Sequence, residues 1–214
     1  MVILYSFINE NKHTYLLDKY LNDNSEIFKI KILRYRRWQD AQLSLLGRVL
    51  LKYGLRNYYH DVNETDIYLT SYNKPFLKGQ NIYFNISHSE NLVVCIIARF
   101  PVGIDVEFLN ESINYRDFRS QMTLKEFDEI YNADDKIKSF FNFWTKKEAV
   151  IKADGRGLKI PLQSIELVDD ECIIDKKRFF VKEISINENY LGHIASDHID
   201  IVNDPLIFEE FFSE

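Results

Sequence analysis

The chain has 214 residues, 46% of them hydrophobic and 28% charged, and a net charge of −6. This length can bury a proper core, as one domain or two small ones. The acidic balance argues against wholesale binding to nucleic acid. No apolar run approaches the roughly 20 residues that a membrane-spanning helix requires. The composition therefore predicts an ordinary soluble globular protein that binds neither nucleic acid nor a membrane.

The first residues and the cysteines both indicate the compartment. The N-terminal stretch MVILYSFINENKH lacks a basic leader and an A-x-A cleavage site, so it predicts a first strand rather than a signal peptide. Cys95 and Cys172 lie inside apolar, strand-like runs and have no CxxC partner. This pattern is typical of buried thiols in a reducing compartment. We therefore expect a cytoplasmic protein in which neither cysteine is a nucleophile.

The first half alternates strands with one long helix. The pattern predicts a strand over 2–8, a helix that ends near Gly54, and short strands over 67–70 and 82–85. Apolar residues at helical spacing indicate that the helix packs on a core, namely Trp38, Leu45, Leu46, Val49 and Leu50. The continuous apolar run over 92–98 predicts a buried strand.

A basic cluster stands out against the acidic average. Five cations fall close together: Lys29, Lys31, Arg34, Arg36 and Arg37. Such a cluster suits a phosphate group or an acidic partner, although a solvated helical face is the more ordinary interpretation.

The second half repeats the combination of strands and helices. It opens with VGIDVEFL over 102–109 and continues through helices expected over 115–131 and 136–153. Three strand-like segments close it, over 179–186, 190–196 and 199–202. The sequence therefore predicts an α+β fold of two halves, 1–102 and 103–214.

Two acidic residues share one face of a predicted strand. The period of two in VGIDVEFL places Asp105 and Glu107 on one side and the apolar residues on the other. Carboxylates this close repel each other unless water or a cation relieves them. Two solvated acids on an exposed strand are common, whereas a site of oxygen ligands would suit Mg²⁺ or Mn²⁺ better than zinc.

A third acid interrupts the apolar face of the last long helix. Glu148 projects at the edge of an arc formed by Phe140, Phe141, Trp144 and Ile151. An ordinary interpretation is an ion pair with Lys152, four residues on, worth about 0.3–0.5 kcal/mol.

Two further segments carry polar groups suited to anions. FNISHSEN places Ser87, His88 and Ser89 just before the apolar strand, where hydroxyls and an imidazole make an anion cradle. Lys74 precedes Pro75 in a turn, and the proline restricts the backbone of the lysine. Taken singly, a hydrogen-bonded loop histidine and a solvated turn lysine are the ordinary alternatives.

The four segments together carry a specific signal. LysPro, FNISHS, GIDVE and FWTKKEAVIK, in this order, resemble the motif series of the 4′-phosphopantetheinyl transferases, specifically the longer Sfp type. The resemblance covers most of the chain, from the basic cluster through Leu158. It implies two similar α/β halves arranged as a pseudo-dimer within a monomer, with the active site between them.

The resemblance also implies roles for individual residues. Asp105, Glu107 and Glu148 would be the ligands of Mg²⁺, with Mn²⁺ as an alternative. Glu148 would also be a candidate base, although which acid takes the proton stays open, and Lys152 would contact and protonate a departing phosphate.

The remaining matched residues are implied to bind coenzyme A. Ser87 and His88 match phosphate contacts, and Lys74 matches a lysine near the nucleotide end. Lys31 and Ser44 match contacts to the 3′-phosphate and adenine. The family favours a basic residue where this chain has Phe28, which departs from the pattern of 3′-phosphate contacts. Lys29 and Arg34 are the candidate substitutes for that residue.

The implied reaction transfers phosphopantetheine from coenzyme A to a serine of an apo acyl or peptidyl carrier protein, and releases 3′,5′-ADP. Two alternatives remain at this stage. One is another Mg²⁺-dependent enzyme acting on a nucleotide diphosphate. The other is a non-catalytic module that binds coenzyme A or a carrier protein.

Overall fold

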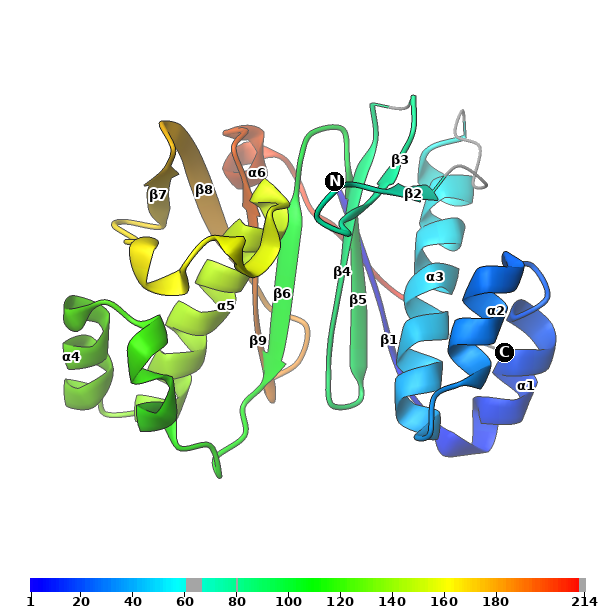
Figure 1. Cartoon of the computed structure of the whole chain (residues 1–214), viewed down its shortest axis with the longest axis horizontal. Coiled ribbons are helices and arrows are strands. Elements are labelled where there is room, and N and C mark those ends of the chain that lie inside the picture. The colour runs from blue at the N-terminus through cyan, green and yellow to red at the C-terminus, as the bar shows by residue number, and fades with distance from the viewer. Residues whose placement is uncertain (61–66, 80, 212–214) are drawn as a thin grey trace.

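Two four-stranded sheets, each covered on its outer face by one long helix, make up the protein (Figure 1). The computed structural model describes residues 1–60, 67–79 and 81–211. Helix α3 (Trp38–Tyr58) packs on the first sheet, and helix α5 (Lys136–Asp154) packs on the second. The predicted α+β fold with two similar halves is confirmed. No helix within the described ranges is long and apolar enough to cross a membrane.

The first sheet has the strand order β10-β1-β5-β4. Strands β4 (Tyr83–Ser89) and β5 (Leu92–Ala98) form an antiparallel hairpin, and β5 also pairs with β1 (Val2–Phe7). Strand β10 (Ile207–Glu210) runs parallel to β1. The end of the chain thus returns to the first sheet, a pairing that the sequence pattern did not indicate.

The second sheet is antiparallel, with the order β6-β9-β8-β7. Its strands are β6 (Gly103–Phe108), β7 (Glu171–Ile174), β8 (Lys177–Ile184) and β9 (Tyr190–Ser196). Strand β6 lies at the edge and faces the edge strand β4 of the first sheet.

Shorter elements complete the two halves. The first half adds α1 (His13–Tyr20), α2 (Glu26–Leu33) and a hairpin of β2 (Ile67–Leu69) with β3 (Pro75–Leu77). The second half adds α4 (Leu124–Asn132) and α6 (Asp200–Asn203). Short 3₁₀ helices span Glu10–Lys12, Tyr115–Gln121, Gly157–Lys159 and Leu162–Ser164.

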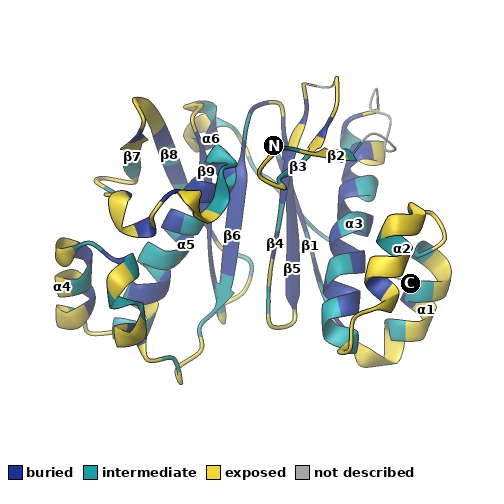
Figure 2. Cartoon of the chain, in the orientation of Figure 1, coloured by how far each residue is buried: buried dark blue, intermediate teal, exposed yellow. Residues whose placement is uncertain are grey.

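Burial explains the layered arrangement. The inner faces of the two sheets share one apolar cluster, to which Ile3 and Val94 contribute from the first sheet and Ile104 and Ile194 from the second. Separate clusters fill the space under α3 and under α5. The sheets and the inner faces of the long helices are accordingly buried, while exposed residues lie mostly on outer helices and loops (Figure 2).

Two predicted elements were wrong. Residues 115–131 do not form one helix, because Met122 is extended and Thr123 begins α4 with a capping box to Glu126. Residues 199–202 do not form a strand but contribute to α6. Ile201 is buried there while Ile199 is exposed, a division that the period of a strand does not give.

Candidate active site

The edges of the two sheets are joined by side chains rather than by a backbone ladder. Alternate residues of β4 point toward β6 and accept its backbone N–H groups. These hydrogen bonds run from Ile104 to Asn85 Oδ1 (2.9 Å), from Val106 to Ser87 Oγ (3.4 Å) and from Phe108 to Ser89 Oγ (3.1 Å). We call this junction the seam. The segment FNISHS is therefore part of a strand, and not a loop as its histidine alone suggested.

The same serines donate to the predicted acids. Ser87 Oγ donates to Asp105 Oδ1 at 3.1 Å, and Ser89 Oγ donates to Glu107 Oε2 at 2.6 Å. Both acids lie on one face of β6, as the period of two predicted, and Asp105 is buried. Each serine thus accepts a strand N–H and holds a carboxylate in place.

A glycine brings these acids close to α5. A Cβ atom at Gly103 would lie 2.1 Å from the carbonyl oxygen of Ala149. Only a residue without a side chain allows the two backbones to approach so closely. The first residue of β6 therefore sets the distance between the strand carboxylates and the helix that carries Glu148 and Lys152.

Lys152 joins the helix to the seam. Its Nζ donates to Asp105 Oδ1 at 2.6 Å and to Ser87 Oγ at 2.9 Å. The ion pair with Glu148 that the helical spacing allows is not formed between these two described residues. Lys152 pairs with Asp105 instead, so the interpretation of Glu148 as one partner of a surface ion pair is not supported.

The charge of Asp105 raises the proton affinity of the other two carboxylates. Burial raises the pKa of Asp105, although the adjacent Lys152 ammonium opposes this shift. Burial and then the charge of Asp105 raise the pKa of both Glu107 and Glu148. One ammonium thus faces three carboxylates, and the seam carries an excess of negative charge when all are ionised.

The donor set fits a hard divalent cation. Asp105 Oδ2 is buried and has no hydrogen-bond partner among the described residues, so one oxygen stays unsatisfied. Carboxylate oxygens are the ligands that Mg²⁺ and Mn²⁺ prefer. The described part of the chain nevertheless has no group of three His, Cys, Asp or Glu side chains close enough to hold a metal ion. The chemistry of the acids fits a metal, but they are not gathered around one point.

Of the coenzyme contacts predicted in the first half, His88 and Lys31 lie within electrostatic range of each other, and His88 also of Lys152. His88 is exposed on β4, and partial desolvation, followed by the charge of Lys152, lowers the pKa of its imidazole. The charge of Lys31 also acts on His88, so the two residues lie within electrostatic range. Lys31 is exposed on α2, and Ser44 is half-buried on α3.

Phe28 also lies beside a cation. The guanidinium of Arg48 is 4.9 Å from the centre of the Phe28 ring. Positive charge is therefore present next to the position where the family favours a basic residue, but it comes from α3.

Lys74 is placed differently from the other predicted residues. Its Nζ donates to the carbonyl oxygens of Lys152 (2.5 Å) and Ala153 (3.1 Å), and lies 3.5 Å from that of Val102. The ammonium is thus in contact with the end of α5 and with the residue that precedes β6.

The sequence pattern gave no role to Asn85 and placed Ser89 only in the anion cradle, although both residues hold β6 at the seam. The sequence does contain a signal for these roles, since the polar residues Asn85, Ser87 and Ser89 occupy every second position, as Asp105 and Glu107 do. What the sequence did not show is that these two strands face each other.

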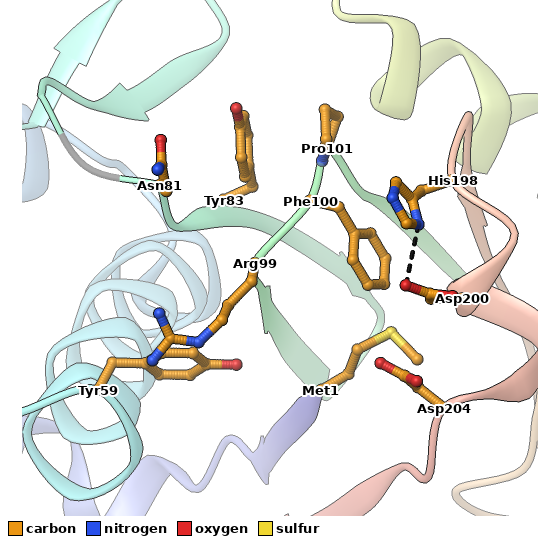
Figure 3. Close-up of a pocket in the computed structure, with 10 residues that line it drawn as sticks. All are labelled: Met1, Tyr59, Asn81, Tyr83, Arg99, Phe100, Pro101, His198, Asp200 and Asp204. Atoms are coloured by element: carbon orange, nitrogen blue, oxygen red, sulfur yellow. Dashed lines mark ion pairs between the residues drawn. The ribbon is translucent and has the colours of Figure 1, made fainter.

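Two cavities lie near the junction of the halves. The larger, of about 590 Å³, is lined by residues such as Tyr59, Arg99, Phe100 and His198, with Arg99 lying along the ring of Tyr59 (Figure 3). None of the predicted site residues lines it. A smaller cavity of about 190 Å³ opens beside Glu107 and includes Ser89, Phe141 and Trp144. The smaller one is therefore the cavity that belongs to the seam.

Comparison with known families gives two adjacent matches. The family model described as the 4′-phosphopantetheinyl transferase superfamily matches residues 101–202. The model described as the N-terminal part of 4′-phosphopantetheinyl transferase matches residues 18–99.

Individual relatives agree with these matches. The chain is 30% identical to the 4′-phosphopantetheinyl transferase ffp of Bacillus subtilis, over 81% of this chain and 82% of the relative. It is 27% identical to Sfp of Bacillus subtilis strain 168, over 81% and 82% of the two chains. It is 38% identical to gsp of Aneurinibacillus migulanus, over 62% of this chain and 56% of the relative. The resemblance drawn from the four motifs is confirmed.

Proposed function

Because the chain belongs to the 4′-phosphopantetheinyl transferase superfamily, we propose that it transfers the 4′-phosphopantetheine group of coenzyme A to a serine of an apo carrier protein. The observation that carries this proposal at residue level is the contact of Lys152 with Asp105 at the seam, where Ser89 holds Glu107 and where Glu148 lies within electrostatic range of Asp105. The class of carrier, acyl or peptidyl, is left open by these residues.

Asp105, Glu107 and Glu148 are the proposed ligands of a divalent cation, Mg²⁺ or Mn²⁺. The unsatisfied Asp105 Oδ2 and the raised pKa of each acid support this assignment, since a cation would relieve both. When bound, the metal would supply charge neutralisation to the diphosphate of coenzyme A.

The phosphates are proposed to lie between the two halves. Lys152, Ser87 and His88 would contact the diphosphate, because Lys152 donates to Ser87 at the seam and lies within electrostatic range of His88. Lys31 and Ser44 would contact the 3′-phosphate and the adenine side from α2 and α3. Lys74 differs from these residues, since its ammonium already donates to carbonyls of α5.

The proposed chemistry needs positioning and proton transfer. The carrier serine Oγ attacks the β-phosphorus of coenzyme A, forming one P–O bond and breaking the P–O bond of the diphosphate. Glu148 is the proposed acceptor of the serine proton, and its raised pKa favours this role because a stronger base accepts a proton more readily. Lys152 neutralises the departing phosphate and donates a proton to it, which releases 3′,5′-ADP.

The two alternatives are less well supported. A module that only binds coenzyme A or a carrier has no need of three carboxylates beside one lysine. An enzyme that transfers the group to water would use the same acids, but the relatives of this chain are named transferases.

Mass spectrometry of the carrier is the direct test. Apo acyl and apo peptidyl carrier proteins are incubated separately with the protein, coenzyme A and Mg²⁺, and each is searched for the added phosphopantetheine on its serine. A carrier that gains the group supports the proposal. Free phosphopantetheine without carrier modification would favour hydrolysis, and no consumption of coenzyme A with either carrier would favour a binding module.

We also propose a cytoplasmic monomer. The free, buried thiols of Cys95 and Cys172 support a reducing compartment. Both sides of the seam come from one chain, so a second copy is not needed to complete it. Light scattering after size-exclusion chromatography tests the oligomeric state.

A further inference from the structure

The ammonium of Lys74 is fully committed to backbone carbonyls. A lysine has three N–H donors, and three carbonyl oxygens, from Val102, Lys152 and Ala153, lie within 3.5 Å of Nζ. Lys74 itself is half-buried. Burial lowers its pKa to about 8, and the charges of Asp154 and Asp197 oppose that shift. No donor of this ammonium is left for a phosphate while these contacts persist.

Two of those carbonyls belong to the last turn of α5. The final carbonyls of a helix have no partner within the helix and carry its negative end, so a cation is favourable there. Helix α5 ends at Gly155, which has a φ of 91°. A Cβ atom at Gly155 would lie 3.0 Å from Lys74 Cδ, so the glycine leaves room for the lysine stem.

Lys74 is presented from the other half of the molecule. It lies in the turn between β2 and β3, where its backbone N–H bonds to Thr70 Oγ1 and its carbonyl accepts from the N–H of Thr70. The same turn makes a second contact with the segment after α5, since Lys159 Nζ is 4.6 Å from the centre of the Tyr72 ring. The β2–β3 turn is therefore docked against the end of α5 at two points.

The carbonyl that Lys74 holds belongs to Lys152. The side chain of this same residue donates to Asp105 and Ser87 at the seam. Resting on the proposed function, we propose that Lys74 is a positioning residue. It fixes the last turn of α5 against the β2–β3 turn, and thereby holds Lys152 beside Asp105, instead of binding a phosphate of coenzyme A.

A double-mutant cycle tests this role in the transfer reaction. Lys74→Met removes the donors and keeps most of the stem, while Lys78→Met, an exposed lysine of the same hairpin whose ammonium lies over the ring of Tyr68, is the matched control. We expect Lys74→Met to lower kcat about 10- to 100-fold, as misplacement of a reacting group does. The KM for coenzyme A should stay within about threefold of the wild type.

Combining the substitution with Lys152→Met distinguishes positioning from direct binding. If Lys74 acts through Lys152, the double variant should be no slower than Lys152→Met alone. Multiplicative losses would overturn the proposal. So would a raised KM that appears with coenzyme A and vanishes with 3′-dephospho-coenzyme A, because that pattern identifies a phosphate ligand.

Hydrogen exchange is an independent test of the same variants that does not depend on activity. Lys74→Met should accelerate exchange of the amides of residues 153–155 and leave those of α3 unchanged, whereas Lys78→Met should alter neither. Unchanged exchange over 153–155 would contradict the positioning role even if kcat falls. If the wild type transfers nothing to any carrier, the proposed function fails, while faster exchange in the variant would still establish the contact with α5.

Discussion

Two lysines of α5 contact carboxylates of other elements at the same distance but in different surroundings. Lys147 Nζ lies 2.6 Å from Glu126 Oε2, and the two side chains are 0% and 4% exposed. Lys152 Nζ lies 2.6 Å from Asp105 Oδ1, with side chains 27% and 5% exposed. Distance alone therefore does not distinguish the two pairs.

The first pair is enclosed and balanced in charge, although Glu126 Oε1, like Asp105 Oδ2, is buried without a hydrogen-bond partner among the described residues. Lys147 also contacts the carbonyl oxygens of Gln121 and Leu162, at 3.3 and 3.0 Å, so its donors are all used. Glu126 accepts the N–H of Thr123 as part of the capping box of α4. One cation meets one anion, and the pair ties α4 and two 3₁₀ helices to α5.

The second pair is open and unbalanced. Asp105 shares its surroundings with Glu107 and Glu148, whose pKa values its charge raises. A buried pair that serves only the fold has no reason to keep such an excess of like charge. Uncompensated negative charge, and not the burial of an ion pair, therefore distinguishes the candidate ligand site between β6 and α5 from the structural pair.

The largest expected effect is loss of transfer when Asp105 is neutralised. Asp105→Asn should reduce kcat/KM about 1,000-fold or more, because loss of a metal ligand removes several kcal/mol of transition-state stabilisation. The free energy of unfolding without ligands should change by less than about 1 kcal/mol, since relief of repulsion offsets the lost ion pair. A carrier assay and chemical denaturation measure the two quantities, and a variant that transfers at the wild-type rate would remove Asp105 from the site.

Neutralising the enclosed pair should have the opposite pattern. Glu126→Gln should cost about 3 kcal/mol of unfolding free energy, since it leaves the Lys147 charge buried without its partner. Activity measured well below the melting temperature should stay at the wild-type level. The double variant Glu126→Gln with Lys147→Met should be more stable than Glu126→Gln, because no unpaired charge remains. A Glu126→Gln variant of full stability would show that the pair is not what joins α4 to α5.

A smaller effect is expected at the seam. Ser89→Ala removes the donor that holds Glu107 and the acceptor of the Phe108 N–H. It should raise the Mg²⁺ concentration for half-maximal activity about 10-fold, as loss of a group that orients a metal ligand does. A Mg²⁺ titration of activity, beside Mg²⁺-dependent melting, checks this. Unchanged Mg²⁺ dependence in both measurements would mean that Glu107 does not need the serine.

The smallest effect concerns pH. Burial and Asp105 raise the pKa of Glu107 from its ordinary 4.5, so the folded protein binds more protons than the unfolded chain above that pH. The contribution of the Glu107 carboxyl to the free energy of unfolding is fully present below about pH 4.5. It is lost as the pH rises through the raised pKa of this carboxyl in the folded protein. Without metal, the melting temperature of Glu107→Gln minus that of the wild type should therefore increase between pH 4.5 and 7. Glu129→Gln, at an exposed glutamate of α4, is the control for the substitution itself. A flat difference for Glu107→Gln would contradict the raised pKa.

Local patterns predicted the parts of the site that local geometry determines. The period of two placed Asp105 and Glu107 on one face of β6, and the helical wheel placed Glu148 at the edge of the apolar arc. The failures at 115–131 and 199–202 were also local. A T-x-x-E signal at Thr123 would have revealed the start of α4.

Contacts between distant segments could not be obtained in this way. The serines of β4 meet β6 across a hairpin and a turn, and Lys74 meets α5 across 78 positions of sequence. Periodicity describes which face a residue occupies, but not which other element lies opposite. The order of the motifs indicated the family, and the structure showed the different partners of Lys74 and Lys152.

The most direct measurement is thermal melting of Glu148→Gln with and without saturating Mg²⁺ and coenzyme A, beside Glu126→Gln and the wild type. We predict that Glu148→Gln is at least as stable as the wild type without ligands, because repulsion from Asp105 is relieved, and that it loses most of the ligand-induced shift. Glu126→Gln should melt at a lower temperature and keep the full shift. A Glu148→Gln variant that keeps the full shift and transfers normally would contradict the three-carboxylate site at the seam.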